Sequence, residues 1–439
     1  MSKAFLGSIF TSMIAISAAC FGGGGDGPPF PDLQPFPPDL EAQLHDIRDG
    51  VAELRGLAAE EQIDEGQISA AELVAYTDEA FAQIDDDDRE ELDAFAKAMR
   101  LMHLIGPDDD LLEIFAYQSS EAVLGFYNFE ERTLVLVADN ATALDGEDEL
   151  VLAHEYVHSF QDLAFDSQRL AKLAEDEDED AATEYGTTVS CLKEGDATLA
   201  MYHYGEAVYG PDWYGQTFGA SVEAEDEAED PTPPGLARYF AFDYLECVRF
   251  AMAVHAQHGW QGIDGAYDEP PWTTEQILHP DKYFSRESSR TAVPASIAGS
   301  LGDGWSRLDA SPFGEFDVYN YLATIIENEA VAAFAAAGWG GGWLSVYATG
   351  PEDGVDTGIV VHLRLDWDTA NDLGEFLLAY GGVVERVSGG DWDGDARVGP
   401  VTWRGDVEFG YASWDERLNR IDIVFASDEA ARDAAAALY

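Results

Sequence analysis

The sequence predicts an α+β protein in which a mainly helical part with one β-hairpin precedes a smaller α+β unit. Apolar residues recur three and four positions apart over most of the first 300 residues, as they do on the buried face of helices. Two short β-rich runs flank a polar turn near residue 130. After Ser300, Gly- and Trp-rich segments typical of strands alternate with helical ones. We therefore divide the chain into a signal (1–20), a linker (21–38), a first domain (39–300) and a C-terminal region (301–439).

The composition excludes partners that carry dense negative charge. The chain has 439 residues, a formal net charge of −63 and a pI near 4.1. Such a surface repels phosphate backbones, so we expect no nucleic-acid partner. The acidic side chains are best explained as a solvated surface, and the 46% of hydrophobic residues suffice for a substantial core.

The N-terminus has the pattern of an export signal. Lys3 precedes an apolar run that ends at Cys20 and is too short for a typical membrane span. A Gly/Pro-rich segment follows. Small residues before a cysteine resemble the lipobox of bacterial lipoproteins, which implies lipidation of Cys20 and a tether to the cell envelope. Ser17 departs from that pattern, where an aliphatic residue is usual, and an ordinary secretory signal is the alternative.

Two further cysteines, Cys191 and Cys247, remain in the exported chain. Cysteines in an oxidising compartment can form a disulfide. The sequence leaves open whether these two meet.

The first domain contains helical stretches before and after the predicted hairpin. The pattern is helical from about residue 39 to 105, and β-rich runs at 123–127 and 133–137 form the hairpin. A helix over about 147–165 follows, and further helices are expected around 187–205 and 236–260. Two acidic loops separate these later helices.

The helix over 147–165 contains the pattern His-Glu-x-x-His, formed by His154, Glu155 and His158. Residues four apart lie on one helix face, so both imidazoles can bind one ion. Glu155 lies beside them and can take a proton from water, as a zinc hydrolase requires. With nine histidines in the chain, chance would produce this pattern on the order of 0.02 times.

A zinc site of this kind needs a third protein ligand. No further histidine follows at the spacing of the metzincin pattern. Two downstream glutamates, Glu184 and Glu194, are the candidates. We favour Glu194 because its neighbours form a better helical pattern and Gly195 would let two helices approach closely. Asp196 or Gln161 could orient an imidazole from behind.

Several motifs in this order resemble gluzincin-type zinc metallopeptidases from a largely uncharacterised bacterial and archaeal group. They are "LGFYNFEERTLVLV", "LAHEYVHSFQD", "CLKEGDATLAMYHYG" and "PPWTTEQILHPDKY". The resemblance runs from about residue 40 to 385 and is strong only in these short motifs. It implies a zincin-like fold, Zn²⁺ held by His154, His158 and Glu194, and Glu155 as the general base.

Other polar residues have weaker patterns. His279 and Tyr283 are candidates to stabilise the oxyanion of the reaction, although they could equally pack in a turn at Pro280. His255 and His258 lie three apart on a helix with no base between them, so we interpret them as surface residues. His203 is interpreted as packed or exposed.

Together these features predict an exported zinc metallopeptidase that acts on a peptide or protein substrate. The predicted upstream hairpin could offer an edge strand to that substrate. A catalytically inactive zinc-binding lipoprotein that acts as a binding or structural module is the alternative. The sequence identifies neither the substrate nor the oligomeric state.

Overall fold

The computed structural model describes most of the chain after the predicted signal. The signal segment 1–20 and Cys20 lie outside the described residues, as do the greater parts of the two acidic loops. None of the described helices is long and apolar enough to cross a membrane. The described residues are 28–57, 63–84, 86–120, 124–129, 131–138, 141–166, 169–170, 172–173, 184–214, 231–290, 293–349, 358–390, 392–394 and 399–439.

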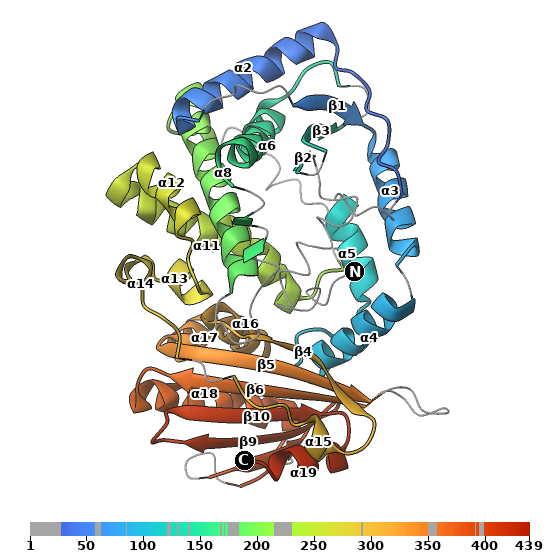
Figure 1. Ribbon diagram of the computed structural model, residues 1–439, viewed down its shortest axis with the longest axis vertical. Helices are drawn as coiled ribbons and strands as arrows, with labels where there is room; N and C mark the ends of the chain where they lie inside the picture. The colour runs from blue at the N-terminus through green and yellow to red at the C-terminus, as the bar shows by residue number, and fades with distance from the viewer. Residues whose placement is uncertain are drawn as a thin grey trace.

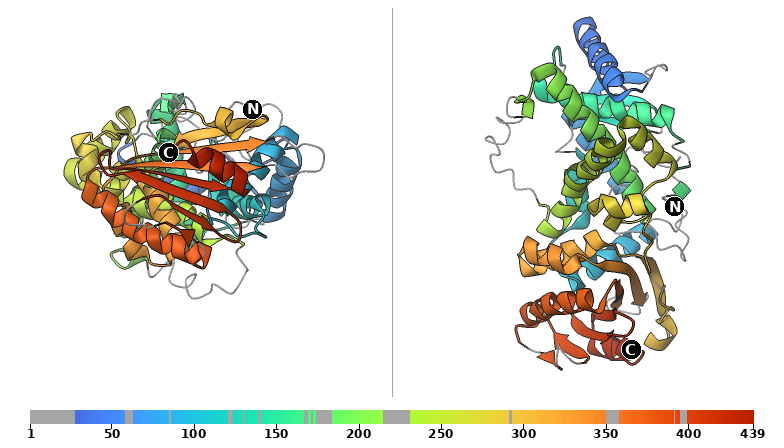
Figure 2. Two further views of the ribbon diagram at one scale, coloured as in Figure 1. Left: turned by 90° about the horizontal axis from the view of Figure 1, so that it is seen from below. Right: turned by 90° about the vertical axis from the view of Figure 1, so that its left-hand side faces the viewer.

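The molecule has a helical tier and a sheet tier, one above the other (Figures 1 and 2). This arrangement confirms the α+β prediction. The helical tier contains α2 (Pro38–Arg55), α3 (Ala70–Ala82), α4 (Asp86–Leu101), α5 (Leu111–Ser120), α6 (Gly146–Ala164), α8 (Tyr185–Tyr209), α11 (Pro234–His258) and α12 (Trp260–Asp268). The short helices α13 (Thr274–Leu278) and α14 (Pro280–Ser285) lead from it towards the sheet tier.

A small sheet in the helical tier contains the predicted hairpin. Strands β2 (Gly125–Asn128) and β3 (Thr133–Val137) pair antiparallel. A third strand, β1 (Asp64–Ile68), pairs parallel to β3, so the prediction of uninterrupted helical structure over 39–105 is wrong there. The reason is tertiary: β1 buries Ile68 against Val135 of β3, and Gly66 has Leu33 packed against it.

The sheet tier is one seven-stranded sheet of order β4-β5-β6-β10-β9-β8-β7. Its strands pair antiparallel. They are β4 (Trp305–Pro312), β5 (Trp339–Thr349), β6 (Ile359–Trp367), β7 (Trp392–Asp393), β8 (Val401–Arg404), β9 (Phe409–Asp415) and β10 (Arg420–Ala426). The change of pattern predicted after Ser300 is therefore real.

Helices cover both faces of this sheet. The first face packs against α16 (Glu315–Ile326), α17 (Glu329–Ala336) and α18 (Ala370–Ser388), and the other against α15 (Ala298–Leu301) and α19 (Glu429–Ala436). Alternate residues of β10 show the division: Ile423 joins the α18 side and Val424 the α19 side. The units β5–β6–α18 and β9–β10–α19 meet where β6 pairs with β10.

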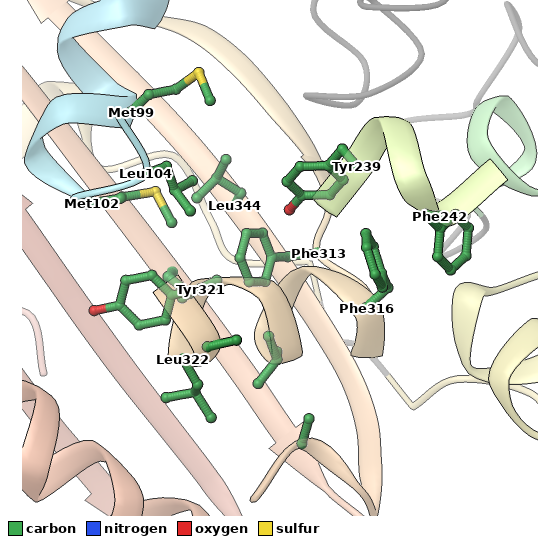
Figure 3. Close-up of a cluster of buried hydrophobic side chains, with 14 of the residues drawn as sticks. Met99, Met102, Leu104, Tyr239, Phe242, Phe313, Phe316, Tyr321, Leu322 and Leu344 are labelled. Atoms are coloured by element: carbon green, nitrogen blue, oxygen red, sulfur yellow. The ribbon is translucent and has the colours of Figure 1, made fainter. Parts of the chain in front are cut away.

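The apolar core continues across the sequence boundary expected near residue 300. Met99 of α4 and Met102, just after that helix, pack in one buried cluster with Phe313 and Leu344 of the sheet tier (Figure 3). Tyr239 of α11 joins the same cluster. The two tiers thus share buried apolar surface, which stabilises their contact by the hydrophobic effect.

Candidate metal centre

Helix α6 positions two of the three candidate ligands. It begins with a capping box, in which the side chain of Asp145 accepts a hydrogen bond from the backbone amide of Asp148 and the side chain of Asp148 accepts one from the backbone amide of Asp145. Its apolar side packs on β3 and α2, with Leu152 and Tyr156 fully buried. This packing fixes the helix so that His154 and His158 share the other side, where both are buried.

The structure brings Glu194 of α8 to these two histidines. The Nε2 atom of His154 lies 3.1 Å from Oε2 of Glu194, and Nε2 of His158 lies 3.4 Å from its Oε1. The two Nε2 atoms are 3.0 Å apart. One ligand atom from each residue therefore points at a common centre, all within 4.8 Å of one another.

These separations suit a tetrahedral zinc ion. Zinc–ligand bonds of about 2.0–2.1 Å place neighbouring ligand atoms about 3.3 Å apart. The donor set, two imidazoles and one carboxylate, is a common one for catalytic zinc and leaves one position open. The residues present therefore fit the ion that the resemblance implies.

Hydrogen bonds behind His158 set the tautomer that a metal needs. The amide nitrogen of Gln161 donates to Asp196 at 3.1 Å and to the carbonyl oxygen of Lys193 at 2.9 Å. Its oxygen then faces Nδ1 of His158 at 3.0 Å, so Nδ1 must carry the proton. The Nε2 lone pair is left for the centre. The weaker partner of His154 is the hydroxyl of Thr198, 3.5 Å from Nδ1.

Asp196 is itself held by a buried ion pair. Arg55 of α2 donates to it at 2.6 Å, and both side chains are inaccessible to solvent. Tyr267 of α12 donates to the same carboxylate at 2.9 Å. A row of contacts therefore runs from Arg55 through Asp196 and Gln161 to His158, and α2 is part of the structure that supports the centre. The sequence offered no signal for Arg55.

Helices α8 and α11 cross closely beside Glu194. A Cβ atom on Gly195 would lie 2.3 Å from the carbonyl oxygen of Cys247, so only glycine fits there. Cys191 and Cys247 form a disulfide across the same crossing, which answers the question that the sequence left open. The crossing fixes the part of α8 that presents Glu194.

Glu155 lies beside the centre and points to β2. Its Oε2 accepts the backbone amide of Tyr127 at 2.9 Å. Burial raises the pKa of Glu155 above its ordinary value, against the lowering effect of His158 and His154. The carboxyl group of Glu155 therefore lies next to the centre, but it is not one of the three side chains that converge there.

The charges of the three converging residues favour positive charge between them. Burial by itself would lower the pKa of His158, but the carboxylate of Glu194 outweighs it and raises that pKa to about 9. Burial would raise the pKa of Glu194, but the two imidazoles lower it well below its usual range. The same attraction acts on a metal cation, which would compete with that proton for the imidazole nitrogen.

Among the described strands, β2 has a neighbour on one side only, and its outer edge lies next to Glu155. It lies at the end of the order β1-β3-β2. The amide of Val137 donates to the carbonyl of Leu124. In an antiparallel pair, every second residue bonds to the partner strand and the residues between them face away from it. The backbone groups of Gly125 and Tyr127 therefore point away from β3. The amide of Tyr127 reaches Glu155 on this side.

The alternative third ligand, Glu184, lies elsewhere. It precedes α8, where its carboxylate accepts the amide of Thr274 at 2.8 Å and the hydroxyl of the same residue at 3.0 Å. Ten residues of helix separate it from Glu194, a rise of about 15 Å. The carboxylate is buried and structural because it joins α8 to α13.

The structure does not bring His279 and Tyr283 to the centre. His279 contacts Glu315 of α16 at 2.9 Å, beside the Thr274 and Glu184 pair. The hydroxyl of Tyr283 donates to the carbonyl of Glu269 at 3.1 Å. The prediction that they act on the oxyanion is therefore corrected: the turn at Pro280 places His279 against α16 of the sheet tier and Tyr283 against Phe250 of α11.

The remaining histidines of the first domain form no metal cluster in the described part of the chain. The ring centroids of His203 and His255 are 5.2 Å apart, and both rings pack with Trp260. His258 packs on Phe284. A second group of acidic residues, Glu275, Glu287 and Asp368, already surrounds the ammonium group of Lys282.

Two exposed aromatic residues border the centre and were missed by sequence reasoning. The ring of Tyr244 on α11 lies 6.4 Å from that of His154, and the side chain is 57% exposed. Phe129, just after β2, lies 5.8 Å from His158. Tyr244 is distant from the motif in sequence and Phe129 lies in the turn of the predicted hairpin, and an isolated aromatic residue carries no pattern that would mark it.

Comparison with known proteins reaches only the sheet tier. Residues 305–436 match a family described as a domain of unknown function (DUF8575). The match begins at β4 and ends in α19, so it includes none of the residues that converge at the metal centre. No curated protein and no solved structure matches the chain.

Proposed function

We propose that this chain is a zinc-dependent peptidase whose metal ligands are His154, His158 and Glu194. The observation that supports this most is the convergence of their ligand atoms at separations of 3.0–3.4 Å. Glu155 lies next to them in a position suited to proton transfer, and β2 offers an open edge on the same side.

The chemistry follows from the roles that the side chains can take. Zinc held by the three ligands would supply a Lewis acid that polarises the scissile carbonyl group and a water molecule. Glu155 removes a proton from the attacking water and delivers it to the leaving amine, so that the peptide bond breaks to an acid and an amine. The hydroxyl of Tyr244, whose ring lies 6.4 Å from that of His154, is a candidate to donate to the oxyanion.

An extended peptide can bind along β2 by strand addition. The backbone groups of Gly125 and the carbonyl of Tyr127 point to that outer side, where no described residue bonds to them, so a peptide can use them as hydrogen-bond partners. Because the amide of Tyr127 contacts Glu155, a peptide on this edge would pass directly over the general base.

The Glu155→Gln variant tests the function. It keeps both imidazoles and Glu194, so we expect about one zinc per chain by elemental analysis. We expect kcat on a peptide library to fall at least about 10³-fold, since the proton acceptor is lost. Glu385→Gln, an exposed glutamate of α18, is the matched control and should retain full activity.

The result separates the two candidate functions. Stoichiometric zinc with no turnover by the wild-type chain would support the inactive binding module. Equal turnover by wild type and Glu155→Gln would contradict the role of Glu155.

We also propose that the chain is exported and tethered through a lipidated Cys20, on the pattern of its N-terminus. Replacing Cys20 by alanine should move the protein from the membrane fraction to the soluble exported fraction. An ordinary secretory signal would instead give the same distribution for both chains.

A further inference from the structure

Lys193, the residue before Glu194 on α8, is a half-buried cation beside the metal centre. Its Nζ lies 4.8 Å from the centroid of the Phe129 ring, and that ring lies 5.8 Å from the ring of His158. The ammonium group, the phenyl ring and the imidazole therefore form a continuous row at the end of β2.

The ammonium group has no acceptor among the residues that the structure describes. The neighbouring carboxylate of Glu194 contacts the two histidines, and Asp162 contacts the hydroxyl of Tyr127 and the guanidinium of Arg132. Phe129 offers its face but no lone pair. Lysine carries three N–H donors, so three are left for another molecule.

Lys282 shows how this chain treats a lysine with a structural role. Three carboxylates, from Glu275, Glu287 and Asp368, lie within 4 Å of its Nζ. In a chain with 86 acidic and 23 basic residues, carboxylates are the commonest partners. Lys193 lies next to two carboxylates, those of Glu194 and Asp162, and both contact other side chains.

We propose that Lys193 binds a carboxylate of the substrate within a few residues of the scissile bond, which makes it a specificity-determining residue. This inference rests on the proposed peptidase function. An extended chain advances about 3.3 Å per residue, so a peptide over Glu155 reaches the Phe129 and Lys193 row within a few residues. A cation at this point also offsets the repulsion that so acidic a protein exerts on acidic peptides.

The carboxylate has two possible sources, and they predict different activities. The α-carboxylate of a peptide C-terminus would make the chain a carboxypeptidase or dipeptidase. An aspartate or glutamate side chain would make it an endopeptidase with acidic preference. Two pairs of peptides separate the two sources. One pair has a free or an amidated C-terminus, and the other has glutamate or glutamine beside the cleaved bond.

The test compares Lys193→Met with Lys193→Arg in the zinc-loaded full chain. We expect Lys193→Met to lower kcat/KM on carboxylate-bearing peptides about tenfold and to leave their amide and glutamine analogues within about twofold. Lys193→Arg should restore much of the preference because it keeps the charge. Lys97→Met, a lysine of α4, is the control. An equal loss on charged and neutral peptides would overturn the inference.

A binding measurement distinguishes this inference from the proposed function. Calorimetry with a short peptide and its C-terminal amide, and with its glutamate and glutamine forms, needs no turnover. If wild type binds a carboxylate form more tightly and Lys193→Met does not, Lys193 has the proposed role even where no peptide is cleaved. Wild-type hydrolysis without any carboxylate preference in either assay would refute the subsite and leave the peptidase function standing.

Discussion

Single residues decide which atoms face the candidate metal centre. His158 owes its orientation to Gln161, whose amide nitrogen is fixed by Asp196 and the carbonyl of Lys193. Glu155 and Glu194 lie in one site with pKa values displaced in opposite directions, because Glu194 contacts both imidazoles and Glu155 is governed by burial. The two carboxyl groups are thus chemically distinct although both are glutamates.

Gln161→Leu tests this orientation. Leucine cannot accept a hydrogen bond from Nδ1 of His158, so we expect zinc affinity to fall about 10- to 100-fold. Competition with a chromophoric chelator measures the affinity. Circular dichroism of the metal-free chain provides the check that the helices remain. Unchanged affinity would mean that Gln161 has no part in holding the imidazole.

At the scale of elements, the crossing of α8 and α11 is the critical contact. Gly195→Ala places a methyl group against the backbone of Cys247, so we expect a loss of about 3 kcal/mol or more in the free energy of unfolding. Gly374→Ala on α18 is the control, because nothing lies within 4 Å of its added Cβ. It should be neutral or stabilise by up to about 1 kcal/mol. Urea denaturation measures both.

The disulfide joins the same two helices. Replacing Cys191 and Cys247 together by serine opens a loop with a sequence separation of 56 residues. Chain entropy predicts a loss of about 4 kcal/mol for such a loop. Thermal unfolding with and without reductant checks the value: wild type should be sensitive to reductant and the double variant insensitive. Equal sensitivity of both would show that the bridge does not form in solution.

At the scale of the whole molecule, buried acidic residues between the tiers make stability depend on pH. Burial raises the pKa of Glu275 from 4.5 to about 7, although Lys282 lowers it in part. In the unfolded chain the group ionises near 4.5. The native state therefore binds the proton more tightly, and this contribution to stability is full below pH 4.5 and is lost as the pH rises through 7.

Glu275→Gln should remove that pH dependence. Between pH 4.5 and 8 we expect wild type to lose about 3 kcal/mol relative to the variant. Glu287→Gln, an exposed partner of the same lysine, is the control and should follow wild type. Parallel stability curves for wild type and Glu275→Gln would contradict the assignment.

The sequence by itself determined what local periodicity and composition govern. The helical spacing of His154 and His158 already placed both imidazoles on one face, and the β-rich runs at 123–127 and 133–137 predicted the hairpin. The change of texture after Ser300 marked the sheet tier. These features depend on neighbours within a few residues, so they can be predicted from a single sequence.

Tertiary structure alone decided the contacts between distant segments. It placed Glu194, the favoured candidate, at the two histidines and Glu184 elsewhere, set His279 away from the centre, and turned 64–68 into a strand beside β3. It also placed Arg55 and Lys193 where the motif gave no hint of them. In each case the deciding interaction joins groups far apart in the chain, and their local sequence is compatible with either outcome.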